Sequence, residues 1–302
     1  MRVAYLGTSD FAVAVLRRLA RSEHGPALVV TPPDRPRGRG RHLEAPPAAV
    51  AALELGIDLH QTESVNRPES VERIRGSAGV AVVCAFGQLI REPLLSALEM
   101  LNVHPSLIPR WRGAAPIERA IMAGDPVSGV TVMRVTEGLD SGPVALQEAE
   151  PIEPGDDYRS LAGRLAELGG ELAVRALDLL VAGELEFVEQ DEALATYAEK
   201  IRPEERRLDL TRPVGELERA VRALAGHAGA YLELEDGTRL GVAAASAEEG
   251  ALAAGEVAAE GGSIRVGCGD GALRLEVVQP PGGRPMPSDA YLRGHPVPRP
   301  AG

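Results

Sequence analysis

The chain has 302 residues, enough for two domains of ordinary size. Hydrophobic residues make up 44% of it and aromatic residues only 3%, so its cores must be built mainly from Ala, Val and Leu. The formal net charge of −12 argues against a general nucleic-acid binder, which carries an overall basic field. Any polyanion must therefore be met by local basic patches.

Targeting and disulfide signals are not found in the sequence. The first residues fit a strand and lack the charged, apolar and small-residue order of a signal peptide. No apolar run approaches the length of a membrane span. Cys84 and Cys268 lie far apart, and two cysteines do not make a disulfide framework. We therefore expect a cytoplasmic protein that binds no membrane.

Strand and helix patterns alternate through the first half of the chain. The expected strands are 2–7, 28–31, 57–60, 80–85, 100–104 and 130–135, and the expected helices are 11–20, 47–55, 70–75, 93–98 and one starting near 114. This order predicts an α/β, Rossmann-like domain with a mostly parallel sheet and helices on both faces. The turn after the first strand lacks the Gly-x-Gly-x-x-Gly fingerprint, which weakens the case for a dinucleotide-dependent oxidoreductase.

Four arginines stand close together in the Gly/Pro-rich segment Asp34–His42. Arginine runs often form only a solvated surface loop. This segment, however, directly follows the second expected strand, on the side where the carboxyl ends of parallel strands open into a ligand crevice. It is the strongest basic patch in the chain.

Polar residues suited to catalysis stand at the end of the strand 100–104. Asn102 and His104 share one face of it because side chains alternate with a period of two. Pro105 then ends the strand. A lone histidine here would be an ordinary packed or surface residue, but an amide on the same face favours a site.

A third candidate, Asp140, follows the strand 130–135 in the loop Thr136–Gly142. By itself it is typical of a turn aspartate that bonds its own backbone. Together with Asn102 and His104 it would complete an amide–imidazole–carboxylate group. The amide would donate to a developing oxyanion, and the carboxylate would orient the imidazole or act as a base.

The segment Val83–Ile90 is a candidate pocket wall. The strand ends at Ala85, and Gly87 would let the backbone approach a flat ring. A plain strand-to-helix turn with Phe86 in the core fits the residues about equally well.

The pattern changes in the second half. The pattern of residues 157–183 predicts one long helix, with Gly169-Gly170 as a candidate break, and a charged segment follows. After a helix over 214–224, short strands separated by Asp236-Gly237, Gly261-Gly262 and Gly269–Gly271 predict a small, open, OB-like β-barrel. The expected domains are 1–190 (catalytic), 191–212 (linker) and 213–302 (barrel).

The motifs around the candidate residues resemble the signature of formyltetrahydrofolate-dependent formyltransferases. They are His104-Pro-Ser-Leu-Ile-Pro-Arg, Trp-Arg-Gly-Ala-Ala-Pro-Ile, Gly-Val-Thr-Val-Met and Gly138-Leu-Asp-Ser-Gly142. The resemblance runs from Met1 to about Asp209 and continues more weakly to the C-terminus. The Trp-containing motif is similar to the version in members that act on methionyl-tRNA, rather than in sugar-modifying or folate-hydrolysing members.

The resemblance implies transfer of a formyl group from the co-substrate 10-formyltetrahydrofolate to the α-amino group of methionyl initiator tRNA, for translation initiation. It implies catalytic roles for Asn102, His104 and Asp140. The implied folate contacts are Cys84, Ala85, Phe86, Gly87, Leu89, Ser106, Leu107, Ile108 and Pro109, and the implied tRNA contacts are Arg37, Arg39, Arg41 and Arg112. Arg39 matches the family's key arginine. No metal is implied, and we expect a monomer.

The C-terminal domain departs from the family pattern. Residues 207–302 hold ten arginines against thirteen acidic residues, a net of −3, whereas a tRNA-contacting barrel should be basic. Ala225–Gly229 also replaces a Pro- and Trp-containing segment. On a candidate basic face we place Arg219, Arg222, Arg239, Arg265 and Arg274.

Two alternatives follow from these features. One is a folate-dependent formyltransferase acting on a nucleotide-linked amino sugar, which would share Asn102, His104 and Asp140 but would not need the arginine loop. The other is a non-enzymatic nucleic-acid-binding protein with a decayed catalytic domain. The complete Asn/His/Asp set argues against decay, and the acidic barrel argues against nucleic-acid binding as the main activity.

Overall fold

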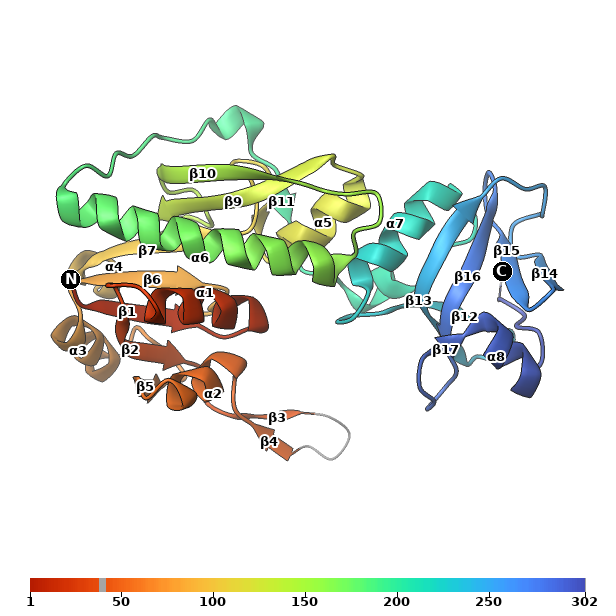
Figure 1. The fold of residues 1–302 in the computed structure, drawn as a ribbon, viewed down its shortest axis with the longest axis horizontal. Helices are drawn as coiled ribbons and strands as arrows, with labels where there is room; N and C mark the ends of the chain where they lie inside the picture. Colours follow the sequence, from red (N-terminus) through yellow and green to blue (C-terminus); the bar gives the residue numbers. More distant parts are fainter. Residues whose placement is uncertain (38–41, 302) are drawn as a thin grey trace. The chain divides into compact units, whose positions relative to one another are not determined.

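The computed structural model describes residues 1–37 and 42–301 (Figure 1). These residues pack into two compact units, neither of which is continuous in sequence. The first unit consists of Met1–Gly113, Val127–Pro151 and Ala162–Tyr197, and the second of Ala114–Pro126, Ile152–Leu161 and Ala198–Gly302.

The first unit is built on a seven-stranded sheet in the order β10-β9-β7-β6-β1-β2-β5. Its strands are β1 (Val3–Gly7), β2 (Pro26–Thr31), β5 (Asp58–Gln61), β6 (Val80–Cys84), β7 (Glu99–His104), β9 (Val127–Arg134) and β10 (Val144–Pro151). The five strands from β5 to β7 are parallel, and β9 and β10 continue the sheet as antiparallel neighbours. The predicted mostly parallel α/β sheet is confirmed.

Helices cover both faces of this sheet. They are α1 (Asp10–Ala20), α2 (Pro47–Glu54), α3 (Pro68–Ser77), α4 (Leu94–Ala97) and α6 (Tyr158–Ala182). Alternate residues of β1 show the two faces: the Tyr5 hydroxyl donates to the carbonyl of Ala12 in α1, whereas Leu6 packs in a cluster with Ile74 of α3. The strands are therefore buried on both sides, which explains their continuous apolar sequences.

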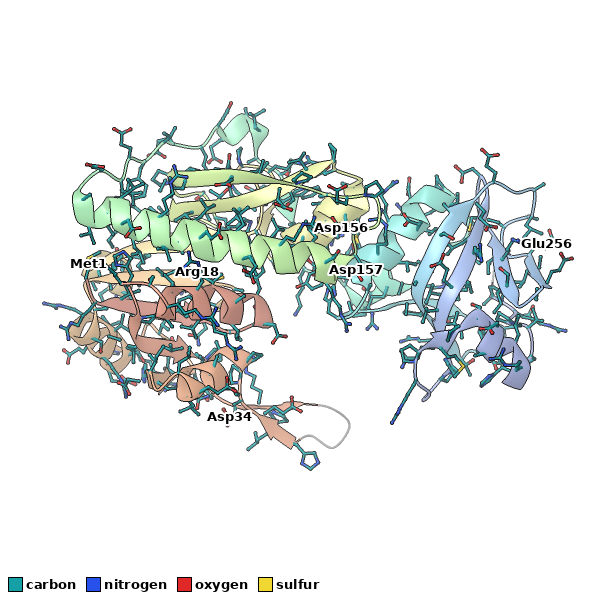
Figure 2. The ribbon with its side chains drawn as sticks, in the orientation of Figure 1. Met1, Arg18, Asp34, Asp156, Asp157 and Glu256 are labelled. Atoms are coloured by element: carbon teal, nitrogen blue, oxygen red, sulfur yellow. The ribbon has the colours of Figure 1, made fainter. Side chains whose placement is uncertain are left out.

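The long helix α6 is unbroken, contrary to the break considered at Gly169-Gly170. A Cβ added at Gly169 would lie 3.0 Å from Cγ1 of Val103 in β7, and one at Gly170 would lie 2.7 Å from Cβ of Arg18 in α1. Arg18, labelled in Figure 2, marks where α1 and α6 pack together. The two glycines allow close packing rather than ending the helix.

The second unit has one core under an antiparallel sheet in the order β12-β13-β16-β15-β14, with β17 paired to β16. Its elements are α5 (Pro116–Ala123), α7 (Val214–Leu224), β12 (Ala230–Glu233), β13 (Arg239–Glu248), β14 (Val257–Glu260), β15 (Ser263–Gly267), β16 (Ala272–Gln279), β17 (Met286–Pro287) and α8 (Ser288–Gly294). Asp236-Gly237 and Gly261-Gly262 join neighbouring strands as predicted, each with its glycines at positive φ. The path of paired strands ends at β12 and β14, so within the described residues the sheet is open.

The remaining elements are short. The strands β3 (Arg35–Arg37) and β4 (His42–Glu44) form a hairpin, and β8 (Arg112–Gly113) pairs with β11 (Tyr197–Ala198). Two 3-10 turns cover Glu192–Leu194 and Pro203–Arg206. In the described part of the chain, every helix is too short or too polar to cross a membrane.

Candidate functional site

The strand β7 carries the first two candidate residues to the edge where the parallel strands end. It lies between β6 and the antiparallel β9, and His104 is its last residue. Asn102 pairs in register with Met133, and His104 with Thr131. Because the strand is pleated, both side chains point to the same face.

Asp140 is the centre of the cluster. Its Oδ1 accepts a hydrogen bond from Nδ2 of Asn102 at 3.2 Å, and its Oδ2 lies 3.5 Å from Nδ1 of His104. The backbone N–H of Gly113 also donates to Oδ2, at 2.9 Å. The three side chains that the sequence predicted to converge are thus brought together, and a backbone donor from β8 joins them.

The surroundings of His104 fix its tautomer. Its Nε2 lies 2.8 Å from the carbonyl oxygen of Trp111, and a carbonyl can only accept, so Nε2 must carry a proton. Nδ1 then faces the carboxylate of Asp140. The imidazole and the carboxylate are therefore held beside each other in one fixed orientation.

The segment after β7, predicted to contact folate, is held at its backbone. Thr131 in β9 donates from its hydroxyl to the carbonyl of Ser106 at 2.7 Å and accepts from the backbone N–H of Ile108 at 3.2 Å. Gln147 in β10 donates to the carbonyl of Ile108 at 2.9 Å. The side chains of Ser106 and Ile108 are buried, while Leu107 and Pro109 are partly exposed. The segment forms a firmly positioned wall.

The residues after β6 divide into two groups. Cys84 and Phe86 are buried, and Phe86 packs in the cluster that contains Ile74 and Leu94. Burial raises the pKa of the Cys84 thiol to about 12, so it is protonated and unreactive at neutral pH. Ala85, Gly87 and Leu89 are exposed, with positive φ at Ala85 and Gly87. The side chain of Phe86, which was predicted to line the pocket wall, belongs to the hydrophobic core.

The residues predicted to bind tRNA have different settings. Arg39 and Arg41 lie outside the described residues, and Arg37 is described only as part of the backbone of β3. Arg112 is only 1% exposed, and its guanidinium donates to Gln190 and, with two nitrogens, to the carboxylate of Glu192. This geometry presents no open face to a phosphate, so Arg112 belongs to the framework of the site.

Two contributors to the site, Gln190 and Thr196, were missed by the sequence analysis. Gln190 donates to the carbonyls of Asp140 and Gly142 at 2.9 and 2.6 Å. Thr196 accepts from the backbone N–H of Trp111 through its hydroxyl at 2.9 Å. Both lie in a segment rich in polar residues whose sequence carries no periodic or motif signal, so only the structure reveals them.

The arginines proposed for a basic face of the second unit are mostly bonded to acceptors. Arg265 and Arg274 share the carboxylate of Glu248. Arg222 pairs with Glu218, Arg219 donates to the carbonyl of Met122, and Arg239 lies over the ring of Tyr231. Three of these five arginines therefore form ion pairs with carboxylates of the same unit, and two of the three share one carboxylate.

No group of three or more His, Cys, Asp or Glu side chains that could hold a metal ion occurs among residues 1–37 and 42–301. The polar cluster itself consists of an amide, an imidazole, a carboxylate and one backbone donor. Such a set is suited to moving a proton and to stabilising a developing negative charge on oxygen.

Comparison with known proteins gives consistent results. Residues 1–177 match the model of the formyl transferase family, and residues 200–296 match the formyl transferase C-terminal domain. A methionyl-tRNA formyltransferase of Phenylobacterium zucineum is 44% identical over 304 residues, covering 99% of this chain and 98% of that protein.

Two solved structures share the fold. One is HypX from Aquifex aeolicus in complex with tetrahydrofolic acid, with a TM-score of 0.68 and 20% identity, covering 98% of this chain and 48% of that one. The other is an N-formyltransferase from Helicobacter canadensis in complex with folinic acid and dTDP-3-aminofucose, with a TM-score of 0.64 and 14% identity, covering 91% of this chain and 98% of that one.

Proposed function

Because this chain belongs to the formyl transferase family, we propose that it transfers the formyl group of 10-formyltetrahydrofolate to the α-amino group of methionyl initiator tRNA. The observation that carries the proposal is that the side chains of Asn102 and His104 both lie against the carboxylate of Asp140. The relative named as acting on methionyl-tRNA matches this chain over nearly its whole length. We assign the chemistry to residues 1–190 and the folate donor to the region of the first unit beside the cluster.

The reaction joins the amine nitrogen to the formyl carbon and breaks the bond from that carbon to the folate nitrogen. A free α-amino group has a pKa of about 8, so it needs only modest help to become the nucleophile. Asp140, with His104 beside it, accepts the proton that the amine loses and returns a proton to the departing folate nitrogen. The cluster therefore needs no metal and no covalent intermediate.

Asn102 is suited to hold the oxyanion that forms as the amine attacks. Its amide nitrogen carries two hydrogens, and only one is directed at Asp140. The second can donate to the oxyanion, and His104, on the same face of β7, is placed to stabilise it as well. Loss of one such donor raises the reaction barrier by about 2.7–4 kcal/mol.

For the folate donor we propose the wall formed by Ser106–Pro109 together with the exposed Ala85, Gly87 and Leu89. The backbone of the first segment is fixed by Thr131 and Gln147, which suits it to hold a flat ring in one orientation. For the tRNA acceptor end we propose Arg37, Arg39 and Arg41, because phosphates require a basic patch on this acidic chain.

The test is an acceptor comparison with purified protein and 10-formyltetrahydrofolate. Methionyl initiator tRNA should be formylated, and a dTDP-linked amino sugar should not. His104→Ala should reduce turnover by about 100- to 1000-fold, the usual range for loss of one oxyanion-stabilising group, with its circular dichroism spectrum unchanged. Transfer to the amino sugar alone, or an active His104→Ala variant, would overturn the proposal.

A further inference from the structure

Gln190 contacts the loop that carries Asp140 at two points. Its side-chain nitrogen donates to the carbonyl of Asp140 at 2.9 Å and to that of Gly142 at 2.6 Å, on either side of Ser141. Gln190 lies 50 residues from Asp140 in sequence, so the contact is tertiary. One amide therefore holds the backbone of the loop immediately at and after the catalytic carboxylate.

The loop needs such an external hold because its backbone is strained. Asp140 has φ 47°, in the left-handed region that side-chain-bearing residues rarely adopt. A residue held there is strained and persists only when its surroundings fix it. The hydrogen bond from Gln190 to the carbonyl of Asp140 acts on the same residue that bears this strain.

Arg112 determines which way the amide of Gln190 points. Its Nε and Nη2 donate to Oε1 of Gln190 at 3.0 and 2.7 Å, so the oxygen must face the guanidinium and the nitrogen must face the loop. Glu192 fixes the guanidinium in turn, through bonds of 2.9 and 2.7 Å to its two carboxylate oxygens. A buried cation thus locks one orientation of the amide.

We propose that Gln190, oriented by Arg112, is a positioning residue that holds the carboxylate of Asp140 in register with His104. The inference rests on the proposed function, which makes Asp140 a catalytic residue. Gln190 touches no reacting atom; it acts through the backbone of the loop. Its loss should impair the chemical step more than the binding of either substrate.

Two substitutions distinguish the donor contacts of the Gln190 amide with the loop from its acceptor contacts with Arg112. Gln190→Met removes both the donor and the acceptor at similar volume. Gln190→Glu keeps the acceptor for Arg112 but turns an oxygen toward the carbonyls of Asp140 and Gly142. Gln279→Met is the matched control, because the amide of Gln279 donates to a loop carbonyl, that of Gly283 at 2.9 Å, away from the cluster.

Both Gln190 variants should lower kcat by about 10- to 100-fold, since a displacement of about 1 Å at a catalytic group costs up to about 100-fold. The KM values for folate and tRNA should change less than about threefold. Near-normal kcat in Gln190→Glu would overturn the proposal, because only the contact with Arg112 survives in that variant. Gln279→Met should match the unsubstituted protein.

A double-variant cycle tests whether Gln190 acts through Asp140. If it does, Gln190→Met should lower the residual rate of Asp140→Asn by less than about threefold. Losses that multiply in the double variant would show an independent role and overturn the proposal.

A spectroscopic measurement keeps this inference separate from the proposed function. In protein with 15N-labelled histidine, the ring nitrogen shifts of His104, assigned with His104→Gln, report how close the carboxylate lies. They should change in Gln190→Met and stay unchanged in Gln279→Met. Unchanged shifts in Gln190→Met would overturn the inference. Failure of the unsubstituted protein to formylate methionyl-tRNA would instead overturn the proposed function.

Discussion

The cluster around Asp140 and the sheet of the second unit use charged residues in opposite ways. Asp140 has a side chain only 16% exposed and is bonded by Asn102 and a backbone N–H, so each contact helps to fix one geometry. In the second unit, Arg265 and Arg274 share Glu248 with side chains 38% and 49% exposed. The first arrangement specifies a position. The second mainly offsets charge, because water weakens exposed pairs.

The largest effect is expected at the half-buried carboxylate of Asp140 when substitution removes its charge. Asp140→Asn should lower kcat by about 10²- to 10⁴-fold, the range for loss of a general acid or base, because the amide cannot accept the amine proton. Single-turnover formylation of methionyl-tRNA would measure this. The exposed, ion-paired Asp289 offers the matched control, since Asp289→Asn should retain full turnover. An active Asp140→Asn variant would remove the basis for treating the cluster as catalytic.

An intermediate effect is expected at a half-buried pair in the second unit. Arg119 donates to both oxygens of Glu205 at 2.6 and 3.1 Å, and these bonds lower the pKa of Glu205 from 4.5 to about 2. Because its pKa is lowered, the ionised Glu205 stabilises the fold when the pH is above the ordinary pKa of 4.5. This stabilisation is lost as the pH falls from about 4.5 toward 2.

Glu205→Gln should therefore lower the free energy of unfolding by roughly 2–3 kcal/mol at pH 7. The gap between the variant and the unsubstituted protein should close as the pH approaches 2. Urea unfolding at a series of pH values measures both quantities, with the exposed Glu260→Gln as control. A gap that is constant with pH would mean that the pair does not stabilise the fold through its charge.

The smallest effect is expected at the exposed pairs. Arg274→Ala should change the free energy of unfolding by no more than about 0.5 kcal/mol, because an exposed ion pair contributes little. The salt dependence of tRNA binding should also stay the same, since Glu248 already offsets this charge. A clearly flatter salt dependence would show that Arg274 contacts phosphate. The exposed ion pairs of the second unit would then have a binding role, contrary to the contrast drawn with the Asp140 cluster.

The sequence predicted those parts of the molecule that depend on local pattern. Alternation placed Asn102 and His104 on one face of β7, and the glycines around Asp140 indicated a loop able to reach them. The strand β10 was missed because its residues are mostly part-exposed or exposed, so it shows no continuous apolar run. It lies at the edge of the sheet, where a strand is less buried and its sequence therefore shows a weaker hydrophobic pattern.

The framework of the site could not be predicted for a different reason. An arginine in a polar segment suggests exposure, yet Arg112 is buried because its partners Gln190 and Glu192 arrive about eighty residues later. Gln190 itself is an unremarkable polar residue until the fold sets it beside Asp140. The residues that form tertiary hydrogen bonds of this kind follow no periodic pattern or motif in the sequence, so they can be identified only from the three-dimensional structure.

The placement of α5 in the second unit has a consequence for synthesis on the ribosome. The helix α5 packs against α7, and Arg219 of α7 donates to the carbonyl of Met122. The whole of α7 emerges roughly a hundred residues after α5, a delay of about 5–20 s at 5–20 residues per second. During that interval the side chain of Met122, which packs against the core that contains Leu217 and Val221 of α7, lacks this partner. The nascent chain thus passes through a stage in which α5 has been synthesised but α7, its packing partner, has not. Chaperones can bind the chain at this stage.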